Sequence, residues 1–170
     1  MLETGLETAP KAGLLHVEIR DEAILLVMAA ANAAQIVAAQ LGLRVARASR
    51  IDGVDRVAIA PGKWLILGGI DQTALARQLG EGASILDMDS AYVCLSLTGG
   101  GWRRVLASGA AIDVERLAPG DAAVTAIAGI NVVLWLTDAD RLELAVTRSY
   151  YRSFLAWLKE TAGPDGIDAT

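Results

Sequence analysis

The residues that could carry out chemistry are few, and one short stretch brings several of them together. Asp87, Asp89 and Ser90 lie in the phrase DMDSAY, at the end of an expected strand. Two carboxylates on one side of a strand end could serve as an acid–base pair or bind a metal ion. The same residue types also suit a turn, because their side chains accept hydrogen bonds from nearby backbone N–H groups. We favour the turn, with a catalytic or metal-binding role as the alternative.

The chain has one histidine, His16, and one cysteine, Cys94. A Ser-His-Asp triad would depend on His16, and a zinc site would need carboxylates for nearly all of its ligands. Cys94 lies in AYVCLSLT, which favours a small buried residue in a strand over a reactive thiol. A single cysteine excludes an internal disulfide and a CxxC metal site. We therefore expect no catalytic residues, no metal site and a cytoplasmic protein.

The only glycine-rich run, Gly99-Gly100-Gly101, separates an expected strand from an expected helix. Backbone N–H groups at such a place can hold an anion. The run lacks the lysine of a P-loop and the GxGxxG pattern of a dinucleotide site. A tight turn between the two elements is the better interpretation, with nucleotide binding as the alternative.

One basic cluster stands out in a chain of net charge −5. A solvated loop is the favoured interpretation, because the three-residue spacing has no apolar stripe beside it. Contact with an acidic partner surface or an anionic ligand is the alternative. The acidic balance argues against binding to nucleic acid, which depends on cations that meet phosphates. The cluster consists of Arg44, Arg47, Arg50 and Arg56.

With 170 residues, of which 54% are hydrophobic, the chain can bury a substantial core in one domain. Residues 23–43 carry no charge and are long enough to cross a bilayer. Three amide side chains within them would be unsatisfied in hydrocarbon, so we expect no membrane span. We interpret the segment as a buried strand, 23–28, followed by an Ala-rich helix, 31–41. The inward face of that helix is expected to consist of Ala33, Ile36, Val37 and Leu41.

Hydrophobic periodicity, interrupted by Gly, Pro and Asp, divides the chain into short elements. Strands are expected at 14–19, 23–28, 55–60, 63–68, 84–87, 91–98, 122–128, 131–136 and 142–146. Helices are expected at 31–41, 71–80, 100–108 and 150–161, with Asp71 and Ser149 as N-caps of the second and the last. The order indicates an α+β fold, interpreted as a duplicated β2-α-β3-α unit in one domain, 14–162. Residues 1–13 and 163–170 are expected to be a flexible N-terminal tail and a C-terminal tail.

Five phrases, in order and with matching spacing, resemble the gamma subunit family of heterotetrameric sarcosine oxidase. They are PGKWLIL at 61–67, DMDS to LSLTG at 87–99, GAAID at 109–113, PG with AGINVVLWL at 119–136, and RS with LAWL at 148–158. The similarity covers residues 32–162. The chain departs from the family at Gly100, which stands in place of a proline, and in the arginine-rich segment 44–56.

The resemblance implies a fold like the folate-binding domain of aminomethyltransferases. It also implies a non-catalytic assembly subunit in a complex that oxidatively demethylates sarcosine to glycine, with tetrahydrofolate as one-carbon acceptor. FAD, FMN, NAD and tetrahydrofolate are then expected on the partner alpha and beta subunits, with none bound by this chain. The alternative is a stand-alone folate-binding or aminomethyltransferase-like module, of which this chain would form about half by domain size.

Contacts with the partner subunits are expected to involve guanidinium groups, which pair with carboxylates across interfaces, and one tryptophan as anchor. Solvated helix faces are the alternative for the arginines. We also expect the isolated chain to expose apolar surface, which would allow a homo-oligomer. The interface candidates are Arg103, Arg104, Arg148, Arg152 and Trp64.

Overall fold

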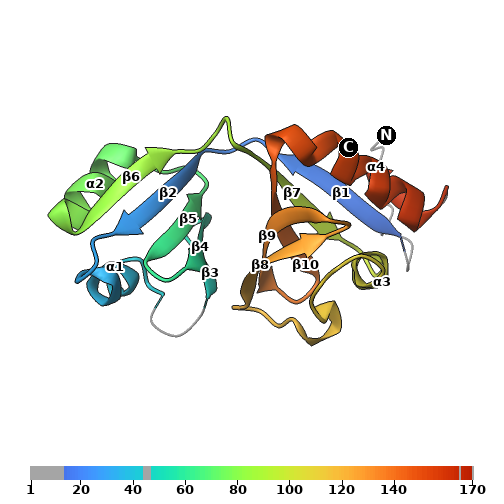
Figure 1. Cartoon of the computed structure of the whole chain (residues 1–170), viewed down its shortest axis with the longest axis horizontal. Coiled ribbons are helices and arrows are strands. Elements are labelled where there is room, and N and C mark those ends of the chain that lie inside the picture. The colour runs from blue at the N-terminus through green and yellow to red at the C-terminus, as the bar shows by residue number, and fades with distance from the viewer. Residues whose placement is uncertain (1–13, 44–46, 165, 170) are drawn as a thin grey trace, which may run out of the picture.

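A computed structural model describes residues 14–43, 47–164 and 166–169. Two β-sheets face each other, and helices lie on the outer side of each (Figure 1). Helices α1 (Ala34–Gln40) and α2 (Gln72–Leu79) accompany one sheet, and α3 (Trp102–Ala107) and α4 (Tyr151–Ala162) accompany the other. The α+β class that the sequence predicts is therefore found.

The five-stranded sheet contains most of the N-terminal half of the chain, in the order β3-β4-β5-β2-β6, and all of its pairs are antiparallel. Its strands are β2 (Ile24–Ala29), β3 (Ala48–Ile51), β4 (Val54–Ala60), β5 (Lys63–Leu67) and β6 (Ala83–Asp87). The short 3-10 helix η1 (Gly80–Gly82) leads from α2 into β6.

The six-stranded sheet has the order β11-β1-β7-β10-β9-β8, and only its β1–β11 pair is parallel. Its strands are β1 (Leu15–Arg20), β7 (Tyr92–Thr98), β8 (Ala122–Ile127), β9 (Ile130–Asp138), β10 (Arg141–Thr147) and β11 (Ile167–Ala169). Two 3-10 helices, η2 (Val114–Arg116) and η3 (Arg148–Tyr150), complete the described part of this half.

The first strand of the chain, β1, does not join the sheet of the strands that follow it. It pairs with β7 in the six-stranded sheet, after which the chain crosses to β2 in the five-stranded sheet. The chain crosses back between β6 and β7, and both crossings lie along one edge of the molecule, at the top of Figure 1. The two sheets are therefore linked twice by the backbone.

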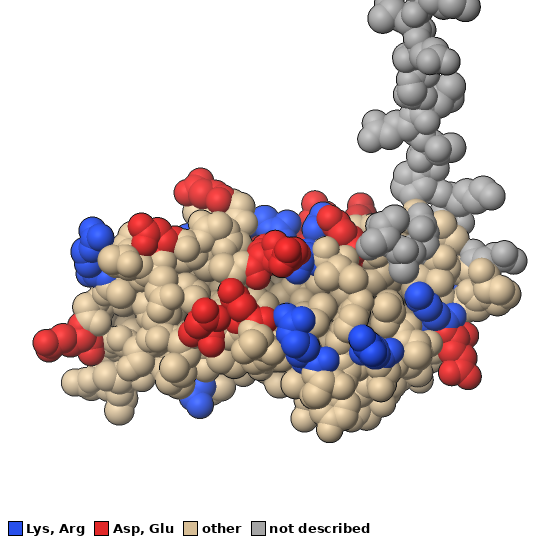
Figure 2. Space-filling view, turned by 90° about the horizontal axis from the view of Figure 1, so that it is seen from above, with Lys and Arg blue, Asp and Glu red and all other residues tan. Residues whose placement is uncertain are grey.

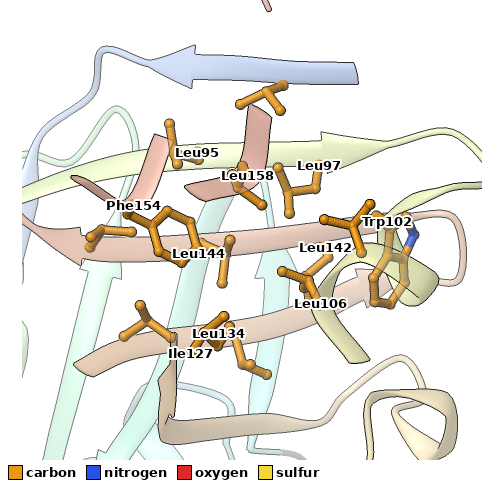
Figure 3. Close-up of a cluster of buried hydrophobic side chains, with 14 of the residues drawn as sticks. Leu95, Leu97, Trp102, Leu106, Ile127, Leu134, Leu142, Leu144, Phe154 and Leu158 are labelled. Carbon is orange, nitrogen blue, oxygen red and sulfur yellow. The ribbon is translucent and has the colours of Figure 1, made fainter. Parts of the chain in front are cut away.

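Buried apolar side chains form one cluster between the two sheets and one between each sheet and its helices. Leu95, Leu134 and Phe154 belong to the cluster under α3 and α4, which Figure 3 shows. Val27 and Val37 belong to the cluster under α1 and α2, and the middle cluster contains Val57, Leu65, Cys94 and Trp135. Many of the hydrophobic residues are therefore buried in three layers of core.

Several local predictions are confirmed. The Asp71 carboxylate accepts hydrogen bonds from the backbone N–H groups of Thr73 and Ala74, at 2.9 and 3.0 Å, as the N-cap of α2. Helix α3 buries Trp102, Val105 and Leu106, the residues of its expected inner face. Cys94 is buried in β7, as expected for a small apolar residue.

Two details of the helices differ from the prediction. Ile36 is 64% exposed, because the short helix α1 turns Val37 toward the core and a neighbouring residue lies about 100° away around the helix. Ser149 does not cap α4, since it lies within η3 and the helix begins after Tyr150 without a side-chain cap. The inward prediction for Ile36 and the capping prediction for Ser149 are therefore wrong.

The segment that follows the predicted domain contains a short strand. Residues 1–13 lie outside the described residues. Within 163–170, Ile167–Ala169 form β11, which pairs with Leu15–Val17 of β1. Three residues are too few to show a strand period, so this segment was expected to be a tail.

No helix within the described ranges is long and apolar enough to cross a membrane. The uncharged segment 23–43 instead supplies β2 and α1, in agreement with the predicted strand and helix.

Replacing Gly99 with alanine should strongly destabilise the fold. Gly99 has φ +88°, and a Cβ atom there would collide with the backbone carbonyl oxygen of Leu14. We expect Gly99→Ala to lower the free energy of unfolding by about 3 kcal/mol, measured by urea denaturation. The matched control is Gly129→Ala. Gly129 has φ +76°, but the space around a new Cβ atom is open, so the free energy of unfolding should fall by only about 1 kcal/mol. Equal losses in the two variants would contradict the predicted collision.

Candidate functional site

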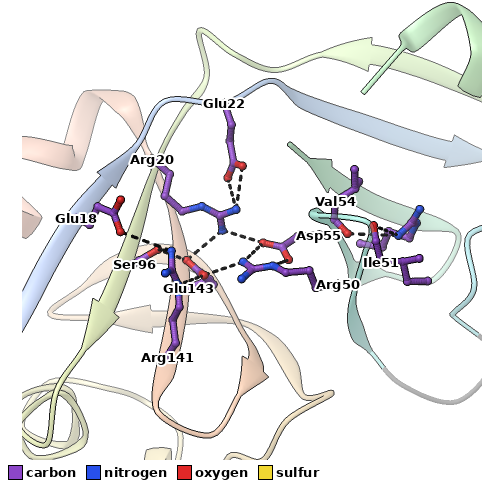
Figure 4. A network of polar contacts seen from close by, with 11 residues as sticks. Glu18, Arg20, Glu22, Arg50, Ile51, Val54, Asp55, Ser96, Arg141 and Glu143 are labelled. Atoms are coloured by element: carbon purple, nitrogen blue, oxygen red, sulfur yellow. Dashed lines mark hydrogen bonds and ion pairs between the residues drawn. The ribbon is translucent and has the colours of Figure 1, made fainter. Parts of the chain in front are cut away.

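The most polar part of the interior lies between the two sheets, where arginines and carboxylates form a closed set of contacts (Figure 4). We call this set the charge network. It brings together side chains from β1, β3, β4, β7, β10 and the β1–β2 crossing. Its members are Arg20, Glu22, Arg50, Asp55, Ser96, Arg141 and Glu143.

Two arginines cross between the sheets in opposite directions. Arg20, on the six-stranded sheet, donates a 2.8 Å hydrogen bond to Asp55 on the five-stranded sheet. Arg50, on the five-stranded sheet, donates a 2.8 Å hydrogen bond to Glu143 on the six-stranded sheet. Arg50 also donates from Nε and Nη2 to both oxygens of Asp55, at 2.6 and 2.8 Å. Each buried carboxylate therefore binds guanidinium groups from both sheets, since Arg20 also lies 3.0 Å from Glu143.

Asp55 and Glu143 are fully buried, yet all four of their carboxylate oxygens have partners. Glu143 additionally accepts from the Ser96 hydroxyl and, at 2.7 Å, from Arg141 Nε. At the rim, Arg20 lies 2.8 Å from Glu22, and Arg141 lies 3.6 Å from the exposed Glu18. Three guanidinium groups face three carboxylates within the charge network, so its formal charges balance.

The partners determine the protonation of the two buried carboxylates. Burial by itself would raise the pKa of Asp55, but hydrogen bonds and positive charge from Arg50 and Arg20 lower it overall. Burial likewise opposes the shift at Glu143, whose pKa is lowered by the Ser96 hydrogen bond, the Arg20 charge and bonds from Arg50 and Arg141. Both side chains are therefore held as carboxylates.

Glu22 behaves differently, because burial outweighs its contact with Arg20 and raises its pKa. The neighbouring negative charges of Asp55 and Glu143 act in the same direction. Cys94, which lies opposite Arg20 in the β1–β7 pair, has its pKa raised to about 12 by burial, so its thiol is protonated near neutral pH. This leaves Cys94 without the thiolate that nucleophilic chemistry requires.

A cleft of about 510 Å³ opens beside the two backbone crossings, lined by Arg20, Glu22, Tyr92 and Arg148 among others. Asp89 and Tyr92 of the DMDSAY phrase line this cleft, and within the phrase the Asp87 carboxylate accepts from Asp89 N–H at 2.9 Å. The Asp89 carboxylate in turn accepts from Ile24 N–H at 2.6 Å. These contacts are those of a turn, the interpretation that the sequence favours.

The glycine run at 99–101 forms the connection from β7 to α3, in agreement with the predicted turn. A second cleft of about 510 Å³ lies beside it, between this turn and the β9–β10 turn. Its two arginines, Arg103 and Arg141, already donate to Val114, Leu117, Ser96 and Glu143. Among the residues that the structure describes, no three His, Cys, Asp or Glu side chains are grouped as a metal ion would require.

Two arginines of the basic cluster lie in strands and not in the solvated loop that the sequence favours. Arg50 lies in β3 and binds buried carboxylates, and Arg56 lies in β4 and donates to the carbonyls of Ile51 and Val54. Arg47 precedes β3, where its backbone N–H donates to Gly120. Arg44 lies outside the described residues. The prediction of a loop is wrong for Arg50 because β3 is short and a charged residue occupies an inward position, whereas Arg56 falls within the strand expected at 55–60.

The interface candidates lie in three different settings. Trp64 is 95% buried under α1 and α2, and so belongs to the core. Arg103 stacks on Trp102, and Arg148 donates to the carbonyls of Asp89, Ser90 and Tyr92. Arg104 and Arg152 are exposed and bind no other described residue, which leaves both guanidinium groups available.

Sequence reasoning missed most of the charge network. One signal was present in the strand RLELAV, where Glu143 interrupts a run of apolar residues and shares its face with Arg141 and Ala145. A charged residue at an inward position of a strand indicates a buried ion pair. Its partners on β1, β3 and β4 depend on the pairing of two sheets, which no local pattern reveals.

No protein-family model and no curated protein matches the sequence. Among solved structures, the chain is similar to one from the heterotetrameric sarcosine oxidase of Corynebacterium sp. U-96, in complex with pyrrole 2-carboxylate. The TM-score is 0.76 at 19% identity, over 89% of this chain and 85% of that chain. It is also similar to the glycine cleavage system aminomethyltransferase T of Bartonella henselae, with TM-score 0.69 at 13% identity. That match covers 94% of this chain but only 48% of the other, and at these identities both show a common fold.

Replacing Asp55 with asparagine should destabilise the chain, because Arg20 and Arg50 would lose one of the two buried carboxylates that they share. We expect Asp55→Asn to lower the free energy of unfolding by about 3 kcal/mol in urea denaturation. The control is Asp52→Asn in the exposed β3–β4 turn, at φ 52°, which asparagine tolerates. A change at Asp55 no larger than that at Asp52 would show that the pairing is not needed.

The charge network also predicts how stability depends on pH. Because the folded-state pKa values of Asp55 and Glu143 are lowered, their contribution is complete above their unfolded pKa values, near 4. It is lost as the pH falls from there through the folded-state values. Glu22, with a raised pKa, contributes in the opposite sense, and its effect is lost as the pH rises above about 4.

Urea unfolding between pH 7 and pH 3 should therefore show a steep loss of stability below about pH 4, shallower in Asp55→Asn than in the wild type. The same slope in both proteins would contradict the assignment of the loss to this network.

Proposed function

We propose that this chain is a non-catalytic gamma-type subunit of a cytoplasmic heterotetrameric sarcosine oxidase complex. The observation that carries the proposal is the extent of the fold likeness, which spans 89% of this chain and 85% of a chain of such an oxidase. The likeness therefore extends over most of both chains. The sequence phrases at 61–67, 87–99 and 148–158 support the same family.

In this proposal the chemistry belongs to the larger alpha and beta subunits. They would carry FAD, FMN, NAD and tetrahydrofolate and convert sarcosine to glycine. The present chain would contribute a rigid body, whose interior charges bind one another and whose buried thiol is protonated. The exposed Arg104 and Arg152 are the candidate contacts that remain available for partner carboxylates.

We further propose that the fold arose by duplication of one unit. The strand orders β3-β4-β5-β2-β6 and β8-β9-β10-β7-β1 correspond position by position, with β1 in the place of β6. Helices α1 and α2 follow β2 and β5 as α3 and α4 follow β7 and β10. This correspondence supports a unit of the aminomethyltransferase folate-binding type.

The second candidate is a stand-alone folate-binding or aminomethyltransferase-like module. The likeness to aminomethyltransferase T, over 94% of this chain, favours it. The chain spans only about half of that protein, at 48%, which favours the subunit instead.

Co-expression with the alpha and beta chains of the sarcosine oxidase from the same genome tests the proposal. We expect the tagged chain to co-purify with both in a stable complex and to raise the yield of soluble alpha and beta chains. Calorimetric titration of tetrahydrofolate into the isolated chain should release no heat of binding. A chain that never co-purifies, or that binds tetrahydrofolate alone, would favour the second candidate.

A further inference from the structure

The edge strand β6 has a vacant position beside it. In the six-stranded sheet, β1 lies antiparallel to β7 and is covered on its other side by the parallel strand β11. In the five-stranded sheet, β6 lies antiparallel to β2 in the corresponding place, and no described strand covers its other side. The comparison of the two sheets identifies room for one more short strand.

The backbone along this edge offers hydrogen bonds. Met88 N–H donates to Ile24, and Ala30 N–H donates to Gly82, which places residues 82, 84, 86 and 88 in hydrogen-bonded pairs with β2. The pairs alternate along antiparallel strands, so the N–H and C=O groups of Ala83, Ile85 and Asp87 point away from β2. No backbone hydrogen bond joins the N–H and C=O groups of these three residues to another described residue.

The β3 and β8 edges differ from β6, because both are bridged by backbone hydrogen bonds. Gly120, just before β8, accepts from the backbone N–H groups of Arg47 and Ala48, which connects the β8 and β3 edges. Ala126 in β8 accepts from Ala111 N–H. Natural proteins commonly blunt a free edge with lysine, proline or a bulge, but β6 has the sequence ASILD and an unshifted register. Its edge is therefore suited to strand addition.

The side chains along β6 indicate what it would bind. Leu86 is 47% exposed and pairs with the partly buried Leu26 on the face toward the other sheet, so it offers apolar contact. Glu81 precedes the strand and Asp87 ends it, both exposed and without a cation bound among the described residues. Figure 2 shows acidic side chains gathered near the middle of the upper face, along which the crossings run. A segment with apolar centre and basic ends complements this edge.

We propose that β6 binds an extended segment of a partner chain, apolar in the middle with Lys or Arg at its ends, as a sixth strand of the five-stranded sheet. The identity of the partner rests on the proposed function, in which that segment belongs to the alpha or beta chain. The strand addition itself depends only on the edge.

The first test uses synthetic peptides and the isolated full chain. We expect the peptide KVTVTVK to shift the amide NMR signals of Ala83, Ile85 and Asp87, and the peptide EVTVTVE to leave them unchanged. Shifts by neither peptide at millimolar concentration, or equal shifts by both, would overturn the proposal. Concentration-dependent shifts at these amides without peptide would show that a second copy of the chain occupies the edge, which also overturns it.

The second test uses the complex with the alpha and beta chains. Leu86→Lys places a positive charge against the basic segment and should weaken assembly about ten-fold. The matched control is Val124→Lys, on the edge strand β8, where Val124 is 55% exposed and assembly should be unaffected. Failure of the wild-type chain to assemble would count against the proposed function, and the peptide result would still decide the edge. If Leu86→Lys assembles as well as the wild type, the partner chain does not bind at β6 and the proposal is overturned.

Discussion

Two fully buried carboxylates, Asp55 and Glu143, lie between the two sheets. The position of one sheet relative to the other depends on the guanidinium groups that neutralise these carboxylates. A buried unpaired charge is strongly destabilising, so each carboxylate requires guanidinium groups in fixed positions. Arg20 and Arg50 reach them from opposite sheets, which satisfies the requirement only when the sheets face each other in one way. Apolar packing alone would tolerate small shifts, whereas these crossed contacts do not.

The placement of β1 in the six-stranded sheet, away from the strands that follow it in the chain, is part of the same constraint. Because β1 joins the six-stranded sheet before the chain crosses, Arg20 at its end reaches Asp55 and Glu143 between the sheets, and Glu22 in the crossing binds Arg20 at the rim. The return crossing carries Asp89, which binds Ile24 N–H at the start of β2. Arg148 then binds carbonyl groups of the return crossing. Backbone linkage and ion pairing thus hold the two halves at the same edge of the molecule.

The sequence predicted the elements better than their assembly. Asp71 and the inner face of α3 follow local rules, since a cap and a helical stripe depend on neighbours in the chain. Ile36 was misplaced because an Ala-rich helix has a weak apolar stripe, and β3 was missed because Arg50 is charged but directed inward. The charge network joins residues up to 93 positions apart, as between Arg50 and Glu143, and therefore has no local signal.

This distribution of buried charge also bears on the kind of function the chain can have. A catalytic site usually keeps an acid, base or nucleophile in reach of substrate with a pKa near the working pH. Here the pKa values of the fully buried carboxylates are lowered by arginines, and that of the Cys94 thiol is raised to about 12. The interior groups therefore serve to position the sheets. Within the described part of the chain, the surface presents a strand edge without a neighbouring strand and two exposed arginines without a carboxylate partner, and both features are suited to binding another chain.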